Sequence, residues 1–306
     1  MGLLSDAYAR ILLALSDRQA VTLDFLLCHR RLPDLGPPRT FNEKVLYRKL
    51  FEHDPRFPKL ADKVLVKDHV AAMLGDDWII PTLWTGKVLP ELEARNWPLP
   101  YVVKANHGCG WNLFVRTARD QDWDRIERVT SRWMNQVHGK PLREWLYLEI
   151  EPRILVEPYV GGQSGVPPID YKFFVFGGKA HYIQVDTGRG VRHRQSFYDT
   201  NWVRQPFHRR YSPNPDLLPR PQSLDRMLRA AERLAAGFSF LRADFYEING
   251  QPRFGELTFY PGAGRLRFMP RSFDRTFGDL WPTEGSLSSS ATRASDFTIP
   301  PPVPPG

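Results

Sequence analysis

The 306-residue sequence has little cysteine and no long apolar run, and each shortage argues against a class of protein. Its two cysteines, Cys28 and Cys109, are too few for a disulfide framework, so we expect a reducing compartment, the cytoplasm. The most apolar stretch near the start, residues 11–15, is far shorter than the ~20 residues that cross a membrane. It also lacks the flanking residues of a secretory signal. The sequence therefore predicts neither a disulfide-rich secreted domain nor a membrane-spanning protein.

The charge balance is basic, with 42 Lys and Arg residues against 34 Asp and Glu and a net charge of +8. This balance favours an anionic partner, such as a nucleotide, an anionic glycan or an acidic membrane surface. Nucleic acid is not favoured, because the basic residues are dispersed and no stripe of aromatic residues is interleaved with them. An aromatic content of 13% excludes intrinsic disorder for the body of the chain, and composition leaves the oligomeric state open.

We expect four parts along the chain: residues 1–85, 86–160, 161–282 and a Ser-rich, then Pro-rich tail at 283–306 that is predicted to be disordered. Predicted helices cover 1–31, a segment that opens with a Thr40–Glu43 capping box, 67–74, 123–138 and 224–236. Predicted strands cover 79–83, 101–104, 112–116 and 154–156, with hairpins that join 171–176 to 180–185 and 241–248 to 253–259. Helices and strands alternate without a repeat, which indicates an α+β or α/β fold.

The first predicted helix is amphipathic, because Tyr8, Ile11, Leu12 and Leu15 recur at helical spacing. We favour packing of its apolar face on the body of the protein. Peripheral contact with the inner face of a membrane is the alternative.

Several common catalytic motifs are missing. The sequence has no phosphate-binding loop of the G-x-x-x-x-G-K-[ST] type, no G-x-G-x-x-G fingerprint, no G-x-S-x-G elbow and no H-E-x-x-H zinc helix. A D-x-D-x-D run at Asp120, Asp122 and Asp124 resembles the metal-binding acids of some sugar-nucleotide transferases. Because it stands at the start of a predicted helix, where acids suit the helix dipole, we favour the structural interpretation.

The predicted hairpin at 241–259 carries the strongest chemical signal. Alternation places Arg242, Asp244 and Tyr246 on one face of the first strand, while Phe254, Glu256 and Thr258 share a face of the second. A two-residue turn at Asn249-Gly250 would send Asp244 and Glu256 to opposite faces, so we predict an odd-length loop that leaves both carboxylates on one face. Two carboxylates on one face suit Mg²⁺, which takes oxygen ligands from the protein and from substrate phosphates.

A lysine next to a glycine-containing loop gives a second, weaker signal. Lys104 ends an apolar strand and leads into Asn106-His107-Gly108-Cys109-Gly110. Glycine allows backbone N–H groups to approach phosphate oxygens, and lysine supplies a positive charge. Lys63, in Ala61-Asp62-Lys63, is weaker still by itself.

Together these motifs resemble the TupA-like (teichuronopeptide-synthesis) family of ATP-grasp enzymes. The segments that carry the resemblance keep their order over residues 40–280: TFNEK from Thr40, LADK from Leu60, YVVKANHG from Tyr101, IDYKFF from Ile169, FYDTNW from Phe197, RADFY from Arg242 and FGELTF from Phe254. The resemblance implies two α+β subdomains that clasp a nucleotide, a lid at 86–160 and a metal-bearing subdomain at 161–282, behind a helical N-terminal region.

The same resemblance implies ATP and Mg²⁺ as cofactors and gives roles to individual residues. Those expected around ATP are Lys63, Lys104, Asn106, His107, Gly108, Gly110, Glu157, the backbone of Tyr159 or Val160, Asp170 and Lys172. Those expected at the metal are Asp244, Glu256 and Thr258, the last in a position where many ATP-grasp ligases carry Asn. Arg242 matches an arginine that steadies the tetrahedral intermediate, and Lys104 assists phosphoryl transfer. For Glu157 and Asp170, ion pairs with nearby Lys or Arg are the alternative.

The implied activity is an ATP-dependent carboxylate–amine ligase that forms an amide through an acyl phosphate, joining an amino acid to a uronic-acid carboxyl of a cell-surface glycan. A basic run at Arg189, Arg192, His193 and Arg194 is interpreted either as an acceptor site or as a solvated loop. A sugar-nucleotide glycosyltransferase, a kinase that stops at phosphoryl transfer and a non-catalytic binder are the alternatives.

Overall fold

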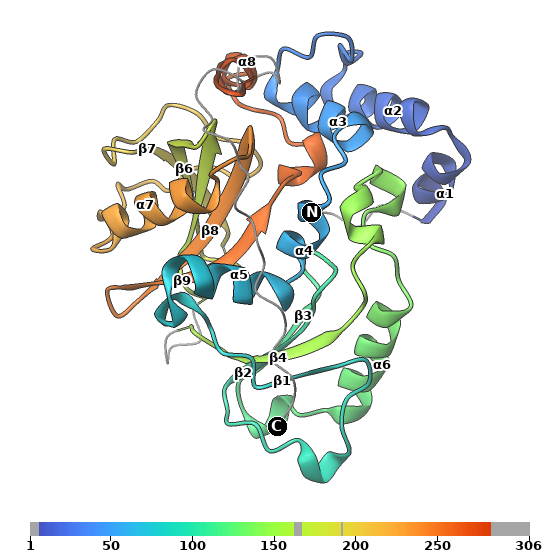
Figure 1. Cartoon of the computed structure of the whole chain (residues 1–306), viewed down its shortest axis with the longest axis vertical. Coiled ribbons are helices and arrows are strands. Elements are labelled where there is room, and N and C mark those ends of the chain that lie inside the picture. The colour runs from blue at the N-terminus through green and yellow to red at the C-terminus, as the bar shows by residue number, and fades with distance from the viewer. Residues whose placement is uncertain (1–5, 162–166, 191, 283–306) are drawn as a thin grey trace.

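A computed structural model of the protein describes residues 6–161, 167–190 and 192–282. Two antiparallel sheets lie apart in the chain and in space, and helices lie against them and between them (Figure 1). The tail at 283–306, which the sequence predicts to be disordered, lies outside the described residues. Within the described ranges, no helix has both the length and the apolar composition needed to cross a bilayer.

The N-terminal region contains two helices where one was predicted. Helix α1 (Asp6–Ala14) and helix α2 (Asp17–His29) are separated because Ser16 caps α2, with reciprocal hydrogen bonds between Ser16 and Gln19. Leu12 packs with Leu142 and Ala263, and Tyr8 and Leu15 lie against the same cluster, so the favoured packing on the body is confirmed for this part of the face. Ile11, predicted on the same face, is 52% exposed instead.

Three further helices follow before the first sheet. Helix α3 (Phe41–Phe51) opens with the predicted capping box, in which Thr40 and Glu43 bond each other's backbone N–H groups. Helices α4 (Arg56–Ala61) and α5 (Leu65–Leu74) come next, the latter at the predicted place.

The small sheet has the strand order β1-β4-β2-β3. Its strands are β1 (Trp84–Gly86), β2 (Tyr101–Ala105), β3 (Asn112–Val115) and β4 (Ile154–Pro158), and helix α6 (Trp123–Met134) covers one face through an apolar cluster that includes Val103, Ile126 and Val156. The predicted strand at 79–83 is wrong, because the first strand begins at Trp84. Pro81 has no N–H for a ladder, and Lys67 binds the Ile80 carbonyl and the Thr82 hydroxyl instead.

The large sheet has the order β7-β6-β5-β8-β9. Its strands are β5 (Asp170–Phe176), β6 (Lys179–Thr187), β7 (Arg194–Asp199), β8 (Phe240–Ile248) and β9 (Gln251–Thr258). Its apolar face packs on helix α7 (Leu224–Leu234), and helix α8 (Ser272–Leu280) packs against α3 around Phe41 and Phe277. Part of the opposite face is charged, because Lys172 of β5 pairs with Asp244 of β8 in the ladder.

The turn of the β8–β9 hairpin differs from its prediction. Ile248 pairs with Gln251, so the turn is the two-residue Asn249-Gly250, with φ of 51° and 72°. Positive φ at both residues is the geometry that Asn-Gly favours in tight hairpins. The predicted odd-length loop is therefore wrong.

The ladder nevertheless brings the two carboxylates together through a β-bulge. Phe245 pairs with Phe254 and Asp244 with Glu256, which leaves Gly255 as the extra residue. The prediction that Asp244 and Glu256 share a face is confirmed, although the bulge and not the loop produces it. Phe254 lies on the other side, in the apolar core at 4% exposure, contrary to its predicted face.

Candidate active site

A chain of ion pairs crosses the charged face of the large sheet. The ammonium of Lys172 lies 2.7 Å from Asp170 and 2.5 Å from Asp244, and all three side chains are at most 5% exposed. Burial alone would lower the pKa of Lys172, but the two carboxylates raise it above the usual value, so the lysine stays protonated. Asp170 and Lys172, which were predicted near the nucleotide, are thus each other's partners.

Arg242 connects this chain to the second carboxylate. Its guanidinium donates to both Asp244 oxygens, from Nε and Nη2 at 2.7 Å each, and Nη2 also donates to Glu256 at 3.2 Å and to the Thr258 hydroxyl at 2.9 Å. Burial opposes ionisation of Glu256, yet Lys172, Lys63 and Arg242 together lower its pKa to about 2. Glu256 is therefore a carboxylate at any physiological pH.

The donors at this place fit Mg²⁺. Asp244 and Glu256 supply carboxylate oxygens and Thr258 a hydroxyl, and Mg²⁺ prefers oxygen ligands shared with water and substrate phosphates. Among the described residues, no three His, Cys, Asp or Glu side chains converge as a metal group. Two carboxylates and a hydroxyl are a donor set that suits a metal completing its shell with phosphate oxygens and water.

On the small sheet, two lysines bind one buried glutamate. Lys104 lies 2.5 Å from Glu157, and Lys67 of α5 contacts the other carboxylate oxygen. Glu157 is 4% exposed; burial alone would raise its pKa, but the two ammonium groups lower it below the usual value. Lys67 was not predicted as part of this site. Its position four residues after Lys63, a spacing of about one helical turn, was the signal in the sequence that could have indicated it.

Lys63 holds the glycine loop through a hydrogen bond. The Lys63 ammonium donates to the Gly108 carbonyl at 2.5 Å, and Lys63 is also among the charges that lower the pKa of Glu256. Gly108 must be glycine, because a Cβ there would come within 2.4 Å of the Trp111 ring. Gly110, also predicted at the triphosphate, has a φ of 74° and is exposed.

Two residues of this loop are structural. The Asn106 amide donates to Asp62 and to the Glu151 carbonyl, and its oxygen accepts from the Arg153 N–H. His107 bonds the Trp133 carbonyl through Nε2, and both side chains are at most 1% exposed. Their predicted place over the triphosphate is not supported for the side chains, which point into the base of the loop.

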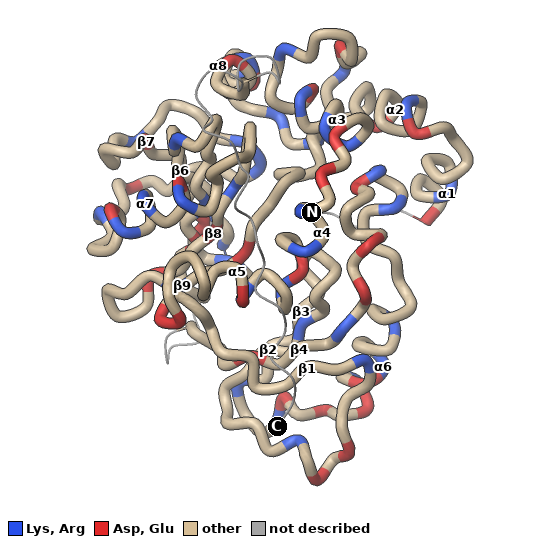
Figure 2. The backbone as a smooth tube through the Cα atoms, in the orientation of Figure 1, with Lys and Arg blue, Asp and Glu red and all other residues tan. Residues whose placement is uncertain are grey.

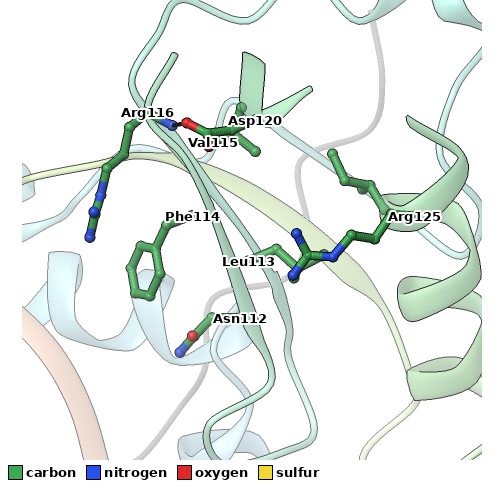
Figure 3. A pocket seen from close by; sticks show the side chains of 8 residues that line it. Asn112, Leu113, Phe114, Val115, Arg116, Asp120 and Arg125 are labelled. Atoms are coloured by element: carbon green, nitrogen blue, oxygen red, sulfur yellow. Dashed lines mark hydrogen bonds between the residues drawn. The ribbon is translucent and has the colours of Figure 1, made fainter. Parts of the chain in front are cut away.

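On the Lys104 face of the small sheet, β3 presents an aromatic and cationic surface. Lys104 pairs with Asn112 in the ladder and Val102 pairs with both Phe114 and Glu157, so these side chains share one face. Phe114 contacts the Tyr159 ring edge-on at 5.6 Å, and the Arg116 guanidinium lies 5.7 Å from each ring. Figure 3 shows Phe114 and Arg116 on the side of β3 opposite Leu113 and Arg125. Phe114 and Arg116 were not predicted as part of a site, although the alternation of side chains along β3 would have placed Phe114 on the face of Lys104.

One of the two predicted backbone contacts is already used. The Tyr159 N–H donates to the Pro100 carbonyl at 2.9 Å, so it has no hydrogen left for a base. This corrects the expectation for the Tyr159 N–H and leaves Val160 as the candidate donor.

The basic run predicted as an acceptor site is partly paired with acids. Arg189 lies 2.7 Å from Asp170, and His193 lies 3.3 Å from Asp186, so half of the predicted basic run turns toward acids of the large sheet. Arg192 is exposed and Arg194 is half-buried. Arg192 and Arg194 are the arginines of this run for which an ion pair with the large sheet is not found among the described residues, and the acceptor site stays a prediction.

The D-x-D-x-D run is structural, as favoured. Asp120 accepts from the N–H groups of Arg116 and Thr117, and Asp122 caps α6 by accepting from Arg125. Asp120 lines a cavity of about 300 Å³, but Asp122 and Asp124 do not. This arrangement gives the glycosyltransferase alternative no metal site.

Two antiparallel sheets, one with paired carboxylates and one with lysines beside a glycine loop, make up an ATP-grasp fold. The chain belongs to the TupA-like ATP-grasp family, whose profile matches residues 43–281. The expected family and fold class are thereby confirmed.

Solved structures of ATP-grasp ligases are similar to this chain. D-alanine–D-alanine ligase from Bacillus anthracis, solved with ATP, is 12% identical with a TM-score of 0.42 over 66% of this chain and 55% of that one. L-amino acid ligase from Bacillus licheniformis is 13% identical with a TM-score of 0.43 over 75% and 53%, so this chain spans little more than half the length of either. Among curated proteins, none matches the sequence.

Proposed function

We propose that the protein is an ATP-dependent carboxylate–amine ligase that forms an amide through an acyl phosphate. The observation that carries the proposal is the pairing of Asp244 with Glu256 on one face of the large sheet, with Arg242 bonded to both. Two positive side chains lie on the nucleotide side of the small sheet: Lys104 on β2, and Lys63, which lies between α4 and α5 and donates to the glycine loop. Membership of an ATP-grasp family supports the same reaction class.

The proposed reaction has two steps, phosphoryl transfer and amide formation. A substrate carboxylate oxygen attacks the γ-phosphorus of ATP, the bond to the β-phosphate oxygen breaks, and ADP leaves. An amine then attacks the acyl carbon, phosphate departs, and the amine loses a proton to yield the amide. Asp244, Glu256 and Thr258 would hold Mg²⁺, which would supply positive charge to the phosphate oxygens.

The residues of the chain position and neutralise the reacting groups. Lys63 and the Gly108–Gly110 backbone act on the triphosphate, and Lys104 acts between the phosphates and the base. Arg242 stabilises the oxyanion that forms when the amine adds to the acyl carbon, because a buried guanidinium acts strongly in a poorly hydrated site. Asp170 is assigned to the ribose hydroxyls.

The adenine site is assigned to the end of β4 and the residues that follow it. The Val160 N–H and the Glu157 carboxylate face the polar edge of the base, and Phe114 and Tyr159 contact its ring. For the substrates, we infer a uronic-acid carboxyl of a cell-surface glycan and an amino acid, with Arg192 and Arg194 toward the anionic acceptor; the reaction takes place in the cytoplasm.

The test is ADP release with uronic-acid oligosaccharides and a panel of amino acids. Asp244→Asn and Glu256→Gln should keep the fold and lose turnover by several orders of magnitude, although Asp244→Asn also removes a partner of buried Lys172 and should lower the unfolding free energy. Asp216→Asn, at an exposed acid of the same subdomain, should match the wild type. Full ADP release by both site variants would overturn the assignment. Release that needs the carboxylate but no amine would instead identify a kinase.

A further inference from the structure

A second cavity, separate from the one lined by Asp120 at β3, lies near helices α2, α3 and α8 and is rich in arginine. It has a volume of about 330 Å³ and is bounded by α2, the start of α3 and the chain that leads into α8. Four arginines line it, Arg31, Arg267, Arg271 and Arg275, together with His29 and Asp274. Basic positions of the α2–α3 loop and of α8 lie at the same end of the protein in Figure 2.

Two of these arginines carry charge that no acid among the described residues balances. Arg31 pairs with Glu43, and Arg275 lies 2.6 Å from Asp279. The Arg267 side chain donates only from Nε, to the Cys28 carbonyl, and the Arg271 side chain makes no hydrogen bond or ion pair with any described residue. A guanidinium pair free of carboxylates matches the oxygens of a phosphate group.

The acid in the cavity is already engaged. Asp274 accepts from the Asn42 N–H at 3.0 Å and from its side-chain amide at 2.9 Å, and it is 8% exposed. Its charge is therefore directed toward α3. The N-terminus of α8 also opens here without a side-chain cap, which adds positive potential to the arginines.

Exposed apolar residues flank the cavity on both sides. Leu32, next to Arg31, is 65% exposed, and Met269, next to Phe268 of the cavity wall, is 50% exposed. Leu27 on α2 is 52% exposed as well. Binding of a soluble phosphate compound would leave these apolar side chains exposed to water. At a bilayer surface, lipid phosphates lie next to the apolar region that leucine and methionine side chains can enter.

We propose that this arginine cavity binds the phosphate of an anionic membrane lipid and seats the protein on a bilayer surface. Arg267 and Arg271 bind the phosphate oxygens, and Leu32 and Met269 enter the adjoining interface. The site lies outside the proposed ligase machinery, so it serves location and not chemistry.

The experiment is co-sedimentation of the full chain with vesicles of phosphatidylcholine containing phosphatidylglycerol. An Arg267→Gln/Arg271→Gln variant should bind roughly 10- to 30-fold more weakly, as expected for two lost interfacial charges. Arg128→Gln/Arg132→Gln removes the same charge from exposed positions of α6 and should bind within about twofold of the wild type. Leu32→Ser/Met269→Ser should weaken binding while the salt dependence remains.

Folding and the source of the phosphate are checked separately. Arg271→Gln alone, which breaks no bond of the described chain, should keep the unfolding midpoint and still weaken vesicle binding. Equal binding by the wild type and the double variant would overturn the proposal, as would saturable binding of glycerol phosphate without any binding to vesicles. Because vesicle binding needs no turnover, failure here is distinguishable from failure of the proposed ligase activity, which ADP release reports.

Discussion

Asp244 pairs with Glu256 across the β8–β9 hairpin because Gly255 is bulged out of the ladder between them and the turn. A Cβ added to Gly255 would lie 3.0 Å from the Asp244 carbonyl oxygen and 3.3 Å from the Tyr246 ring. The close approach explains why a residue without a side chain stands at this position. The geometry of the carboxylate pair thus depends on one glycine.

Gly255→Ala should disturb the carboxylate pair more than the fold. The methyl group must displace the backbone of Asp244, which should cost roughly 1–3 kcal/mol of unfolding free energy and at least tenfold in ADP release at subsaturating MgATP. Urea unfolding and initial rates measure the two effects. Asn249→Gly, in the turn of the same hairpin, keeps the positive φ and should leave both values near those of the wild type. A Gly255→Ala enzyme with unchanged rates would show that the bulge does not control the site.

Lys172→Met should be strongly destabilising. It leaves Asp170 and Asp244 buried without their shared ammonium, and breaking a buried ion pair from one side costs about 3–5 kcal/mol. Urea unfolding at neutral pH measures the loss. Asp170 keeps Arg189 and Asp244 keeps Arg242, but without Lys172 the site holds one unbalanced negative charge more. Adding Asp170→Asn to Lys172→Met removes that excess buried charge and should recover part of the loss. A double variant no more stable than the single one would refute the shared pairing.

Part of this site could be predicted from the sequence because it depends on local periodicity. Alternation along 241–246 put Arg242 and Asp244 on one face, and the Thr40–Glu43 box marked the start of α3. The predicted helix at 1–31 failed at Ser16, whose own capping box with Gln19 is an equally local signal that the apolar spacing obscured.

The remainder depends on contacts between distant residues, which periodicity does not contain. The bulge at Gly255 arises from pairing between two strands, and the sequence of the turn at Asn249-Gly250 does not predict it. The inward turn of Asn106 depends on Asp62, 44 residues away, and the pairing of Glu157 with Lys67 joins a strand to a helix. Such pairings decide whether a polar side chain braces the fold or faces a ligand.

Phe114→Ala should weaken nucleotide binding. Phe114 is 44% exposed on the Lys104 face of the small sheet, so its loss leaves the fold almost unchanged but removes a stacking surface for the base. Base–aromatic stacking of about 1–3 kcal/mol corresponds to a rise in KM for ATP of roughly 10- to 100-fold with little change in kcat. Initial-rate measurements of ADP release separate the two constants. Val88→Ala, at an 80% exposed position near the same sheet, is the matched control and should not alter KM; a Phe114→Ala enzyme with the wild-type KM would remove β3 from the base site.

His138 should make the protein sensitive to acid. Its ring contacts Trp111 at 5.4 Å and Tyr147 at 4.7 Å, and burial, with the charge of Lys63, lowers its pKa to about 4. A lowered folded pKa means that the unfolded chain binds the proton more readily, so the free energy of unfolding falls as the pH drops below the ordinary value of ~6.5 and stops falling below about 4. Between pH 7 and pH 5 this group should remove about 1–2 kcal/mol, the side chain being half-buried.

His138→Phe keeps the aromatic contacts and removes the titration, so its unfolding free energy should decline less than that of the wild type over the same interval. Urea unfolding at the two pH values gives the difference, and the NMR titration of the His138 ring reports its pKa directly. Because the imidazole lies near Lys63, which braces Gly108, its protonation would place a second positive charge beside the glycine loop. A His138 resonance that titrates near the ordinary histidine value, together with equal pH dependence of the two proteins, would show that the ring is more hydrated than its packing indicates.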